Sequence, residues 1–325
     1  MIISQTPYRV SFAGGGTDLP AYYRDEPGAV LSVALGKHMY VTVSPRFAAS
    51  TRVAYSKTEI ADTIDQLDHT IVREALRLTG LGRHLEITTI GDVPAGTGLG
   101  SSSTLTVGLL NALYAYKGRV SGPEKLAQEA CDIEIDILGK PIGRQDQYAA
   151  AYGGLNFIRF LPDDTVEVEP VPTRRETLDE IESRALMLYT NQQRDADAIL
   201  QKQSDGTADR RGVLREMAAL ASEMRQCLAG DADVDGFAEL MHQGWELKRS
   251  LGFGISSAFV DDWYQKARQY GAQGGKLLGA GGGGFLFLLA PPQSHEAIRD
   301  ALGRPREIDF SIDRRGSRLI FISDH

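Results

Sequence analysis

The chain has 325 residues, of which 42% are hydrophobic, and it carries a formal net charge of −8 at pH 7. This length and apolar content can form two domains with substantial cores, while the acidic balance argues against a general nucleic-acid binder. The longest apolar run, residues 285–290, is too short to span a bilayer, and no secretory signal is apparent. Cys131 and Cys227 indicate neither a disulfide framework nor a zinc site. We therefore expect a cytoplasmic protein without membrane or nucleic-acid partners.

The first half of the chain predicts a series of strands, with helices between the later ones. Runs of β-branched and alternating apolar residues favour strands, and apolar residues at a helical spacing favour helices. The expected strands cover residues 2–5, 9–13, 29–35, 39–44, 51–54, 85–90 and 155–160. The expected helices cover residues 65–78 and 123–138, together with helices that begin near residues 101 and 143.

Residues 91–110 (GDVPAGTGLGSSSTLTVGLL) predict a loop, a helix N-cap and a helix. Glycines alternate at Gly96, Gly98 and Gly100, and three serines follow them. Glycine adopts the backbone angles that point successive N–H groups one way, and a helix N-terminus adds unpaired donors. The stretch therefore predicts a phosphate site, although an ordinary capped helix would also fit. It has neither the lysine of a Walker A loop nor the spacing of a dinucleotide fingerprint.

A looser, charged region with three prolines, residues 161–183, separates the two halves. We place the domain boundary there, with an N-terminal domain at 1–172 and a C-terminal domain at 173–325. The second half mixes helices with a few strands, which is typical of an α+β domain. Its expected helices cover residues 195–203, 207–228, 234–250, 256–270 and 294–302. Its expected strands cover residues 185–190, 274–278, 285–289, 306–310 and 318–322.

Three separated stretches resemble the three motifs of the GHMP kinases, a superfamily of small-molecule kinases. They are residues 7–18 (PYRVSFAGGGTD), 94–104 (PAGTGLGSSST) and 274–284 (GGKLLGAGGGG), in the family's order. The resemblance implies an α+β, two-domain GHMP kinase fold. Its N-terminal domain would be of the ribosomal-protein-S5-like type and its C-terminal domain ferredoxin-like. ATP and Mg²⁺ would be the cofactors, with ATP between the domains.

The resemblance also assigns the cofactor-binding residues. Mg²⁺ would be held by Glu134 and by Ser103 or its neighbour Ser102. Glu134 is also the acid nearest the apolar face of its predicted helix, although from that pattern alone a salt bridge at the helix edge is the simpler interpretation. The ATP phosphates would lie against Pro94, Gly96, Gly98, Leu99, Gly100, Ser101, Ser102, Ser103 and Thr104.

Asp146 and Arg9 are the catalytic residues that the resemblance implies. Asp146, in the GRQDQ segment, lies where family members with a catalytic aspartate carry it, and Arg9 matches a basic residue of the first motif. A carboxylate beside an acceptor hydroxyl can take its proton, and a nearby cation can keep that carboxylate ionised. A helix cap is the structural alternative for Asp146.

The first motif resembles that of sugar kinases, in which an aspartate at the position of Asp18 holds a sugar hydroxyl; a turn aspartate is the alternative. Its Gly-Gly-Gly replaces the Gly-Glu-His of galactokinases, which argues against galactose. Residues 12–20 and 189–203 most resemble the D-glycero-D-manno-heptose 7-phosphate kinases, and more loosely the fucokinases. The substrate-binding residues would then be Gly15, Gly16, Thr17, Asp18, Arg194, Gly281 and Gly282.

The resemblance implies phosphorylation of the anomeric hydroxyl of a heptose 7-phosphate, for activated-heptose and surface-polysaccharide synthesis. Arg194 would help to bind the substrate phosphate, with Arg144 and Lys202 as weaker candidates. Two alternatives stay open: a sugar-1-kinase of the same fold for fucose or a hexose, and a non-catalytic sugar and ATP sensor. The oligomeric state is also open, with a homodimer as one option.

Overall fold

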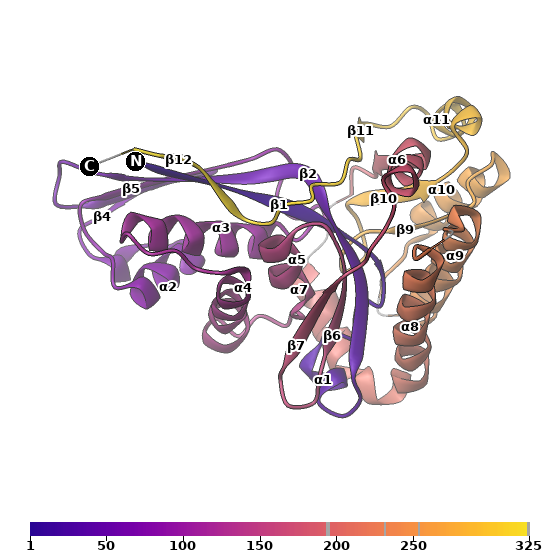
Figure 1. The fold of residues 1–325 in the computed structure, drawn as a ribbon, viewed down its shortest axis with the longest axis horizontal. Coiled ribbons are helices and arrows are strands. Elements are labelled where there is room, and N and C mark those ends of the chain that lie inside the picture. The colour runs from indigo at the N-terminus through magenta and orange to yellow at the C-terminus, as the bar shows by residue number, and fades with distance from the viewer. Residues whose placement is uncertain (193–195, 231, 253, 324–325) are drawn as a thin grey trace.

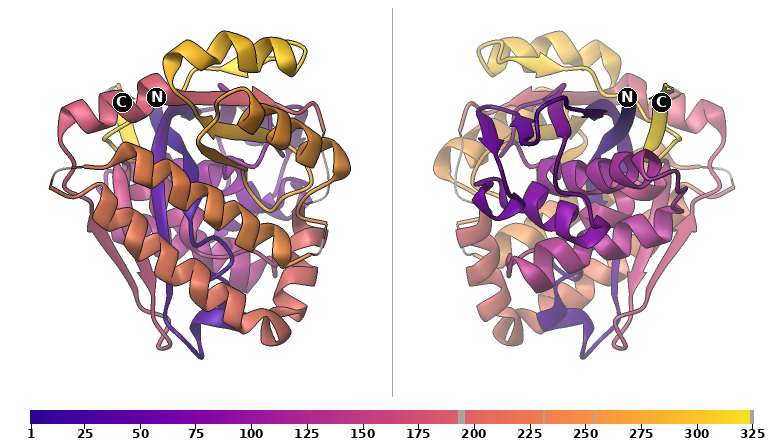
Figure 2. Two further views of the ribbon diagram at one scale, coloured as in Figure 1. Left: turned by 90° about the vertical axis from the view of Figure 1, so that its right-hand side faces the viewer. Right: turned by 90° about the vertical axis from the view of Figure 1, so that its left-hand side faces the viewer.

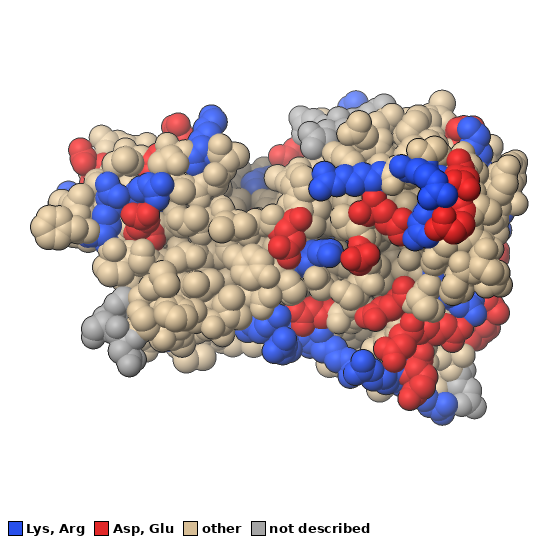
Figure 3. All heavy atoms as spheres, turned by 90° about the horizontal axis from the view of Figure 1, so that it is seen from above, with Lys and Arg blue, Asp and Glu red and all other residues tan. Residues whose placement is uncertain are grey.

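The computed structural model describes residues 1–192, 196–230, 232–252 and 254–323, and it has two lobes, each built on one β-sheet (Figure 1). Within this described part of the chain, no helix is long and apolar enough to cross a membrane. Seen from above, positive and negative side chains are interspersed over the visible face (Figure 3).

The first lobe contains an eight-stranded sheet organised around β1 (Ile2–Ala13) and β2 (Gly28–Pro45), which pair in antiparallel fashion. One half of β2 pairs with β6 (Leu155–Phe160) and the other half with β5 (Leu85–Gly91). We expected two strands where β2 runs unbroken. The register shifts between Pro7 and Tyr8, which leaves Gly36 and Lys37 unpaired in a bulge, and the strand bends there without ending. The sheet is completed by β3 (Thr51–Ala54), β4 (Thr58–Ala61), β7 (Val166–Pro170) and β12 (Arg318–Ile322).

Helix α3 (Ser101–Tyr116) packs against β1 and β2, and almost all of its residues are buried. Further helices surround it on the same face of the sheet (Figure 1). The predicted helix at 123–138 is α4 (Pro123–Cys131) continued by a π-helical turn, η2 (Asp132–Ile137). The remaining helical segments of this lobe are α1 (Pro20–Tyr23), η1 (Ile64–Gln66), α2 (Thr70–Thr79) and α5 (Gln145–Tyr152).

The second sheet is antiparallel, with the strand order β11-β8-β10-β9. In chain order the lobe reads strand, helices, strand, strand, helix, strand, which is the ferredoxin-like arrangement. The expected α+β fold is therefore confirmed. Helices α8 and α9 lie side by side along the outside of this lobe (Figure 2). Its elements are β8 (Ala185–Tyr189), α7 (Ala196–Asp205), α8 (Thr207–Cys227), α9 (Val234–Ser250), α10 (Ala258–Gln269), β9 (Gly274–Leu277), β10 (Phe285–Leu289), η3 (Pro292–Ser294), α11 (His295–Ala301) and β11 (Glu307–Ile308).

The region at 161–183, expected to be loose, instead contains β7 and most of α6 (Arg175–Arg184). The helix was missed because it is strongly charged and buries only Thr177, Leu178 and Ile181. Strand β12 pairs with β1, so the end of the chain returns to the first sheet and the two termini lie close together (Figure 1). The domain boundary at residue 172 stays a prediction.

The two lobes share an apolar core that positions the first motif against the second sheet. The Phe12 ring of β1 lies 5.2 Å from that of Phe237 on α9 and 5.7 Å from that of Phe287 on β10, measured between centroids. Because these rings are buried, any displacement of one lobe would open a cavity at their contact. This core therefore holds the loop that follows β1 in a defined position.

Candidate active site

The glycine-rich loop lines a cavity of about 650 Å³ between the two lobes. Gly96, Gly98 and Gly100 have φ values of 75°, 82° and 76°, in the left-handed region that favours glycine, and α3 begins directly afterwards at Ser101. The backbone donors of a helix N-terminus thus face an open volume, as phosphate binding requires. The walls include these of the expected ATP-binding residues: Pro94, Gly96, Gly98, Gly100, Ser101, Ser102 and Ser103.

The two other expected ATP-binding residues lie beneath the loop and support it. Leu99 is buried, and its carbonyl accepts a hydrogen bond of 3.2 Å from the backbone N–H of Arg9. The buried Thr104 hydroxyl donates to the carbonyl of Gly100 at 2.9 Å. The first contact holds the loop against β1, and the second holds it against the first turn of α3.

The third motif packs directly on the second. A Cβ atom added to Gly98 would lie 2.4 Å from the carbonyl oxygen of Leu278, closer than real Cβ contacts allow. Gly279 and Gly281 also line the larger cavity. Gly282, another expected substrate residue, donates its N–H to the carbonyl of Ile255 at 2.9 Å. The third motif therefore forms one wall of the larger cavity.

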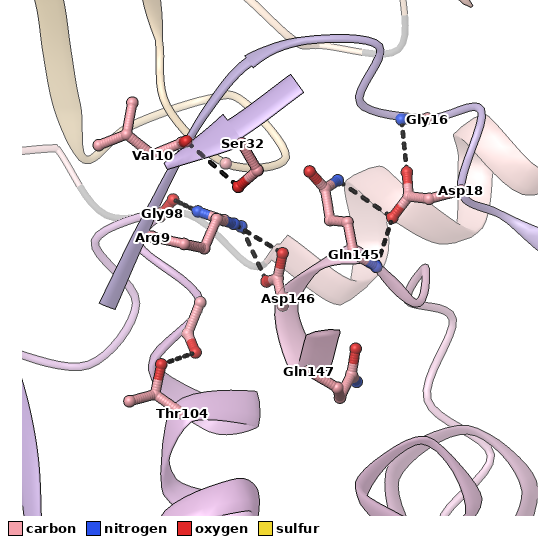
Figure 4. Close-up of polar contacts among 12 residues, drawn as sticks. Arg9, Val10, Gly16, Asp18, Ser32, Gly98, Thr104, Gln145, Asp146 and Gln147 are labelled. Atoms are coloured by element: carbon pink, nitrogen blue, oxygen red, sulfur yellow. Dashed lines mark hydrogen bonds and ion pairs between the residues drawn. The ribbon is translucent and has the colours of Figure 1, made fainter. Parts of the chain in front are cut away.

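Arg9 and Asp146 form a bidentate ion pair where this cavity meets a smaller one (Figure 4). Arg9 Nε and Nη2 donate to the two Asp146 carboxylate oxygens at 2.7 and 2.8 Å, and Nη1 donates to the carbonyl of Gly98 at 2.6 Å. Asp146 lies in the first turn of α5, where the helix dipole favours a negative charge. The side chain of Arg9 is 6% exposed and that of Asp146 21%, so the carboxylate remains accessible to a ligand.

Asp18 lies in the wall of the smaller cavity, on the loop after β1 (Figure 4). Its carboxylate accepts hydrogen bonds from Gly16 N at 2.8 Å, Gln145 Nε2 at 3.0 Å and Gln145 N at 3.3 Å. Burial raises the pKa of Asp18 even though the backbone donors oppose this. Thr17 instead turns its hydroxyl to the backbone, donating to the Gly14 carbonyl at 2.8 Å.

Gly15 and Gly16 also line the smaller cavity. Arg194, expected to bind the substrate phosphate, lies outside the described residues. Of the weaker candidates, Lys202 is exposed on α7, and Arg144 donates to the Asp164 carbonyl at 2.8 Å. The structure thus brings together the first motif, the second motif and the GRQDQ segment.

Glu134 is completely buried in the π-helical turn η2, so it is not an acid at a helix edge. Its Oε1 accepts from the Ser102 hydroxyl at 2.5 Å and from Lys140 Nζ at 3.1 Å, and its Oε2 accepts from Gln147 Nε2 at 2.9 Å. Ser102 rather than Ser103 contacts this carboxylate. A carboxylate and a hydroxyl are ligands that Mg²⁺ accepts, and Lys140 demonstrates that the pair can hold a cation. Among the described residues, no group of three or more His, Cys, Asp or Glu side chains is arranged as a metal site.

Two buried lysines in the smaller cavity were not singled out from the sequence. Lys248 on α9 and Lys276 on β9 are each 5% exposed and line its wall. The sequence pattern could have identified Lys248, because this lysine lies on the same face of α9 as the buried Met241 and Trp245. A lysine in the core-facing stripe of a helix is unusual enough to mark a candidate.

A glycine loop at a helix N-terminus that faces an Arg–Asp pair between two lobes is an arrangement that suits a small-molecule kinase. The family models for the GHMP kinases N terminal domain and the GHMP kinases C terminal match residues 68–154 and 218–306. A D-glycero-alpha-D-manno-heptose 7-phosphate kinase of Campylobacter jejuni is 30% identical, over 97% of each chain. The crystal structure of a D-glycero-D-manno-heptose 1-phosphate kinase from Bacteroides thetaiotaomicron is 27% identical, with a TM-score of 0.83 over 100% of each chain.

The bifunctional fucokinase/GDP-fucose pyrophosphorylase of Arabidopsis thaliana is 27% identical over 95% of this chain and 32% of its own length. The chain belongs to the GHMP kinase family. It is an ATP-dependent phosphotransferase of the sugar-kinase group, so the resemblance found in the three motifs is confirmed.

Replacing Gly98 by alanine tests the contact between the second and third motifs. The added Cβ combines backbone strain of about 1–2 kcal/mol with a collision against Leu278. We expect a lower melting temperature and an ATP KM at least tenfold higher, measured by thermal denaturation and steady-state kinetics. Gly118→Ala is the matched control, because Gly118 also has a positive φ of 70° but no atom within 4 Å of an added Cβ. Equal effects in both variants would contradict a role for the contact.

Proposed function

We propose that this protein transfers the γ-phosphoryl group of ATP to the anomeric hydroxyl of D-glycero-D-manno-heptose 7-phosphate, giving the 1,7-bisphosphate. The observation that carries the proposal is the Arg9–Asp146 pair, which lies between the glycine-loop cavity and a second cavity lined by Asp18. The full-length similarity to heptose phosphate kinases supports the choice of sugar. The product would supply activated heptose for surface-polysaccharide synthesis in the cytoplasm.

In this proposal ATP binds in the larger cavity, with its phosphates against the glycine loop and the N-terminus of α3. The sugar binds in the smaller cavity, where the Asp18 carboxylate accepts a hydrogen bond from one of its hydroxyls. Asp146 takes the proton of the attacking hydroxyl, and the two hydrogen bonds from Arg9 orient the carboxylate and keep it ionised. Because Arg9 also contacts the Gly98 carbonyl, its charge lies beside the phosphate loop, where negative charge develops during transfer.

We also propose that Glu134 and Ser102 hold Mg²⁺, with oxygens of the phosphates and water completing its coordination. When bound, Mg²⁺ would offset the charge of the phosphates. The buried Glu134 carboxylate supports this assignment, because it accepts from the Ser102 hydroxyl, Lys140 Nζ and Gln147 Nε2 and already lies beside one cation, Lys140. Lys140 donates to the Ser102 hydroxyl oxygen and to Glu134 Oε1, and it would have to share or give up these contacts when the ion binds.

Turnover against a set of sugars tests the proposed substrate. The set contains heptose 7-phosphate, mannose 6-phosphate, mannose, fucose and galactose, with ADP release as the measurement. We expect the highest kcat/KM with heptose 7-phosphate and weaker activity with mannose 6-phosphate. Activity confined to fucose or to unphosphorylated hexoses would establish the alternative sugar-1-kinase. No ADP release with any sugar would instead favour a sugar and ATP sensor.

Replacing Asp146 by asparagine tests the proton acceptor. The amide keeps the shape of the side chain but cannot take a proton, so kcat should fall by about 10²–10⁴-fold. ATP affinity, measured by calorimetry, should change little. Asp62→Asn is the control for the loss of one negative charge, because Asp62 is exposed and is not among the residues that line the two cavities. Turnover near the wild-type value in Asp146→Asn would remove Asp146 from the mechanism.

Replacing Glu134 by glutamine tests the metal assignment. We expect the wild-type protein to bind ADP more tightly in the presence of Mg²⁺, and the variant to lose most of this gain because it lacks the anionic oxygen. Calorimetric titration of ADP with and without Mg²⁺ measures the difference without relying on turnover. Asp136→Asn, an exposed acid in the same π-helical turn, is the matched control. An unchanged gain in Glu134→Gln would exclude this carboxylate as a ligand.

A further inference from the structure

The smaller cavity contains more positive charge than the mechanism above requires. Lys248 and Lys276 enter it from α9 and β9, and both are 95% buried. Lys248 Nζ donates to the Gly279 carbonyl at 2.7 Å, and Lys276 Nζ donates to the Phe12 carbonyl at 3.3 Å. Each ammonium has three donors, and these acceptors are neutral carbonyls. Among the ion pairs of the described residues, none involves either lysine.

The nearby carboxylates are engaged elsewhere. Asp146 accepts two hydrogen bonds from Arg9, and Asp18 accepts from Gly16 and Gln145. With all five charged groups of the cavity ionised, three cations face two anions. Burial without a carboxylate partner is costly for an ammonium. Accordingly, burial and the nearby Arg9 lower the pKa of Lys248 to about 8. Burial and the nearby Lys248 lower the pKa of Lys276 well below its ordinary value.

Unpaired donors surround the same space. The Ser11 hydroxyl and the Gln203 Nε2 amide are buried and lack a hydrogen-bond partner within the described structure. A Cβ atom on Gly15 would lie 3.6 Å from Ser11 Oγ and 4.0 Å from Lys248 Nζ, and one on Gly16 would lie 2.1 Å from Gln203 Nε2. Because these two glycines lack side chains, the donors can approach the loop after β1, and all of them line the smaller cavity. Buried donors without acceptors are rare in folded proteins, and such donors are available to a bound ligand or to water.

We propose that Lys248 and Lys276, together with the Ser11 hydroxyl and the Gln203 amide, bind the phosphate group of the acceptor sugar, an inference that rests on the proposed function. A phosphate dianion accepts several charge-assisted hydrogen bonds and balances the excess positive charge, whereas a neutral sugar hydroxyl does neither. The phosphates of ATP are a poorer occupant, because the glycine loop lines the larger cavity and neither lysine belongs to its walls.

Lys248→Met and Lys276→Met test the site by kinetics. We expect the KM for heptose 7-phosphate to rise at least 30-fold in each variant, as the loss of one partner of a buried charged contact implies. The KM for ATP should stay within twofold. The variants should melt at or above the wild-type temperature, since each loses an unpaired buried charge. Lys266→Met, at an exposed lysine of α10, is the matched control and should change none of these values.

Unphosphorylated heptose separates a substrate-phosphate site from a role in phosphoryl transfer. With this sugar, the methionine variants should lose far less kcat/KM than they lose with heptose 7-phosphate. An equal loss with phosphorylated and unphosphorylated sugar would overturn the proposal, because it would assign the lysines to the transferred group. If the wild type phosphorylates heptose 7-phosphate while both variants retain its KM, the phosphate site is wrong and the proposed function stands. If the wild type accepts only unphosphorylated sugars, the proposed substrate itself is wrong.

Proton uptake gives a readout that does not depend on turnover. Lys248 is faced by Arg9 of β1, Asp18 of the following loop, Asp146 of α5 and Lys276 of β9. A bound phosphate raises the pKa of both lysines, so the protein should take up protons when mannose 6-phosphate binds. The affinity for mannose 6-phosphate should fall as the pH rises above about 8, because Lys248 then loses its proton in the free protein. Calorimetry at pH 8 in two buffers of different ionisation enthalpy measures this uptake. Uptake that is absent in the wild type, or unchanged in the double methionine variant, would overturn the proposal.

Discussion

The bidentate contact between Arg9 and Asp146 is the interaction on which the site depends. One guanidinium, 6% exposed, binds both oxygens of the carboxylate and the carbonyl of Gly98, and so connects β1, the first turn of α5 and the glycine loop. A planar, permanently charged group with five donors can make these contacts together, whereas lysine cannot. The pair sets the orientation of the proposed proton acceptor relative to the phosphate loop, and it lies where the two cavities meet.

The position of that pair is maintained by packing at two places. Phe12, three residues after Arg9 on β1, anchors the first motif in an aromatic cluster shared by both lobes. Gly98 lies so close to Leu278 that the second and third motifs are in backbone contact. Protein interiors are too dense to deform continuously, so these two contacts hold three distant segments in one geometry. The charged groups of the smaller cavity are thereby kept together in spite of the cost of burying them.

That cost is a sign of function rather than of stability. Buried, unpaired ammonium groups destabilise a fold, and replacing them by apolar side chains of similar volume is often neutral or favourable. Lys248 and Lys276 nevertheless lie in the core, with the unpaired Ser11 and Gln203 beside them. Buried charges without carboxylate partners and buried donors without acceptors thus occur side by side, and sites that bind ligands are where such departures from the usual rules are expected.

Prediction from the sequence succeeded where a local pattern was enough. Helix α9 was predicted with the bounds that the structure has, because its apolar residues recur at a helical spacing between clear ends. The charged helix α6 was missed, because a helix that buries few residues has no such pattern. Strand β2 was divided in two at Gly36, because a bulge and a turn have the same local composition.

The sequence by itself determined the motifs and their order, and hence the family, because each motif is a property of consecutive residues. The tertiary structure decided which of these residues meet. It brought Arg9 to Asp146 across 137 positions, turned Ser102 rather than Ser103 toward Glu134, and gathered two lysines beside the first motif. No local pattern contains such contacts, because they arise from the packing of two sheets and the course of the chain between them.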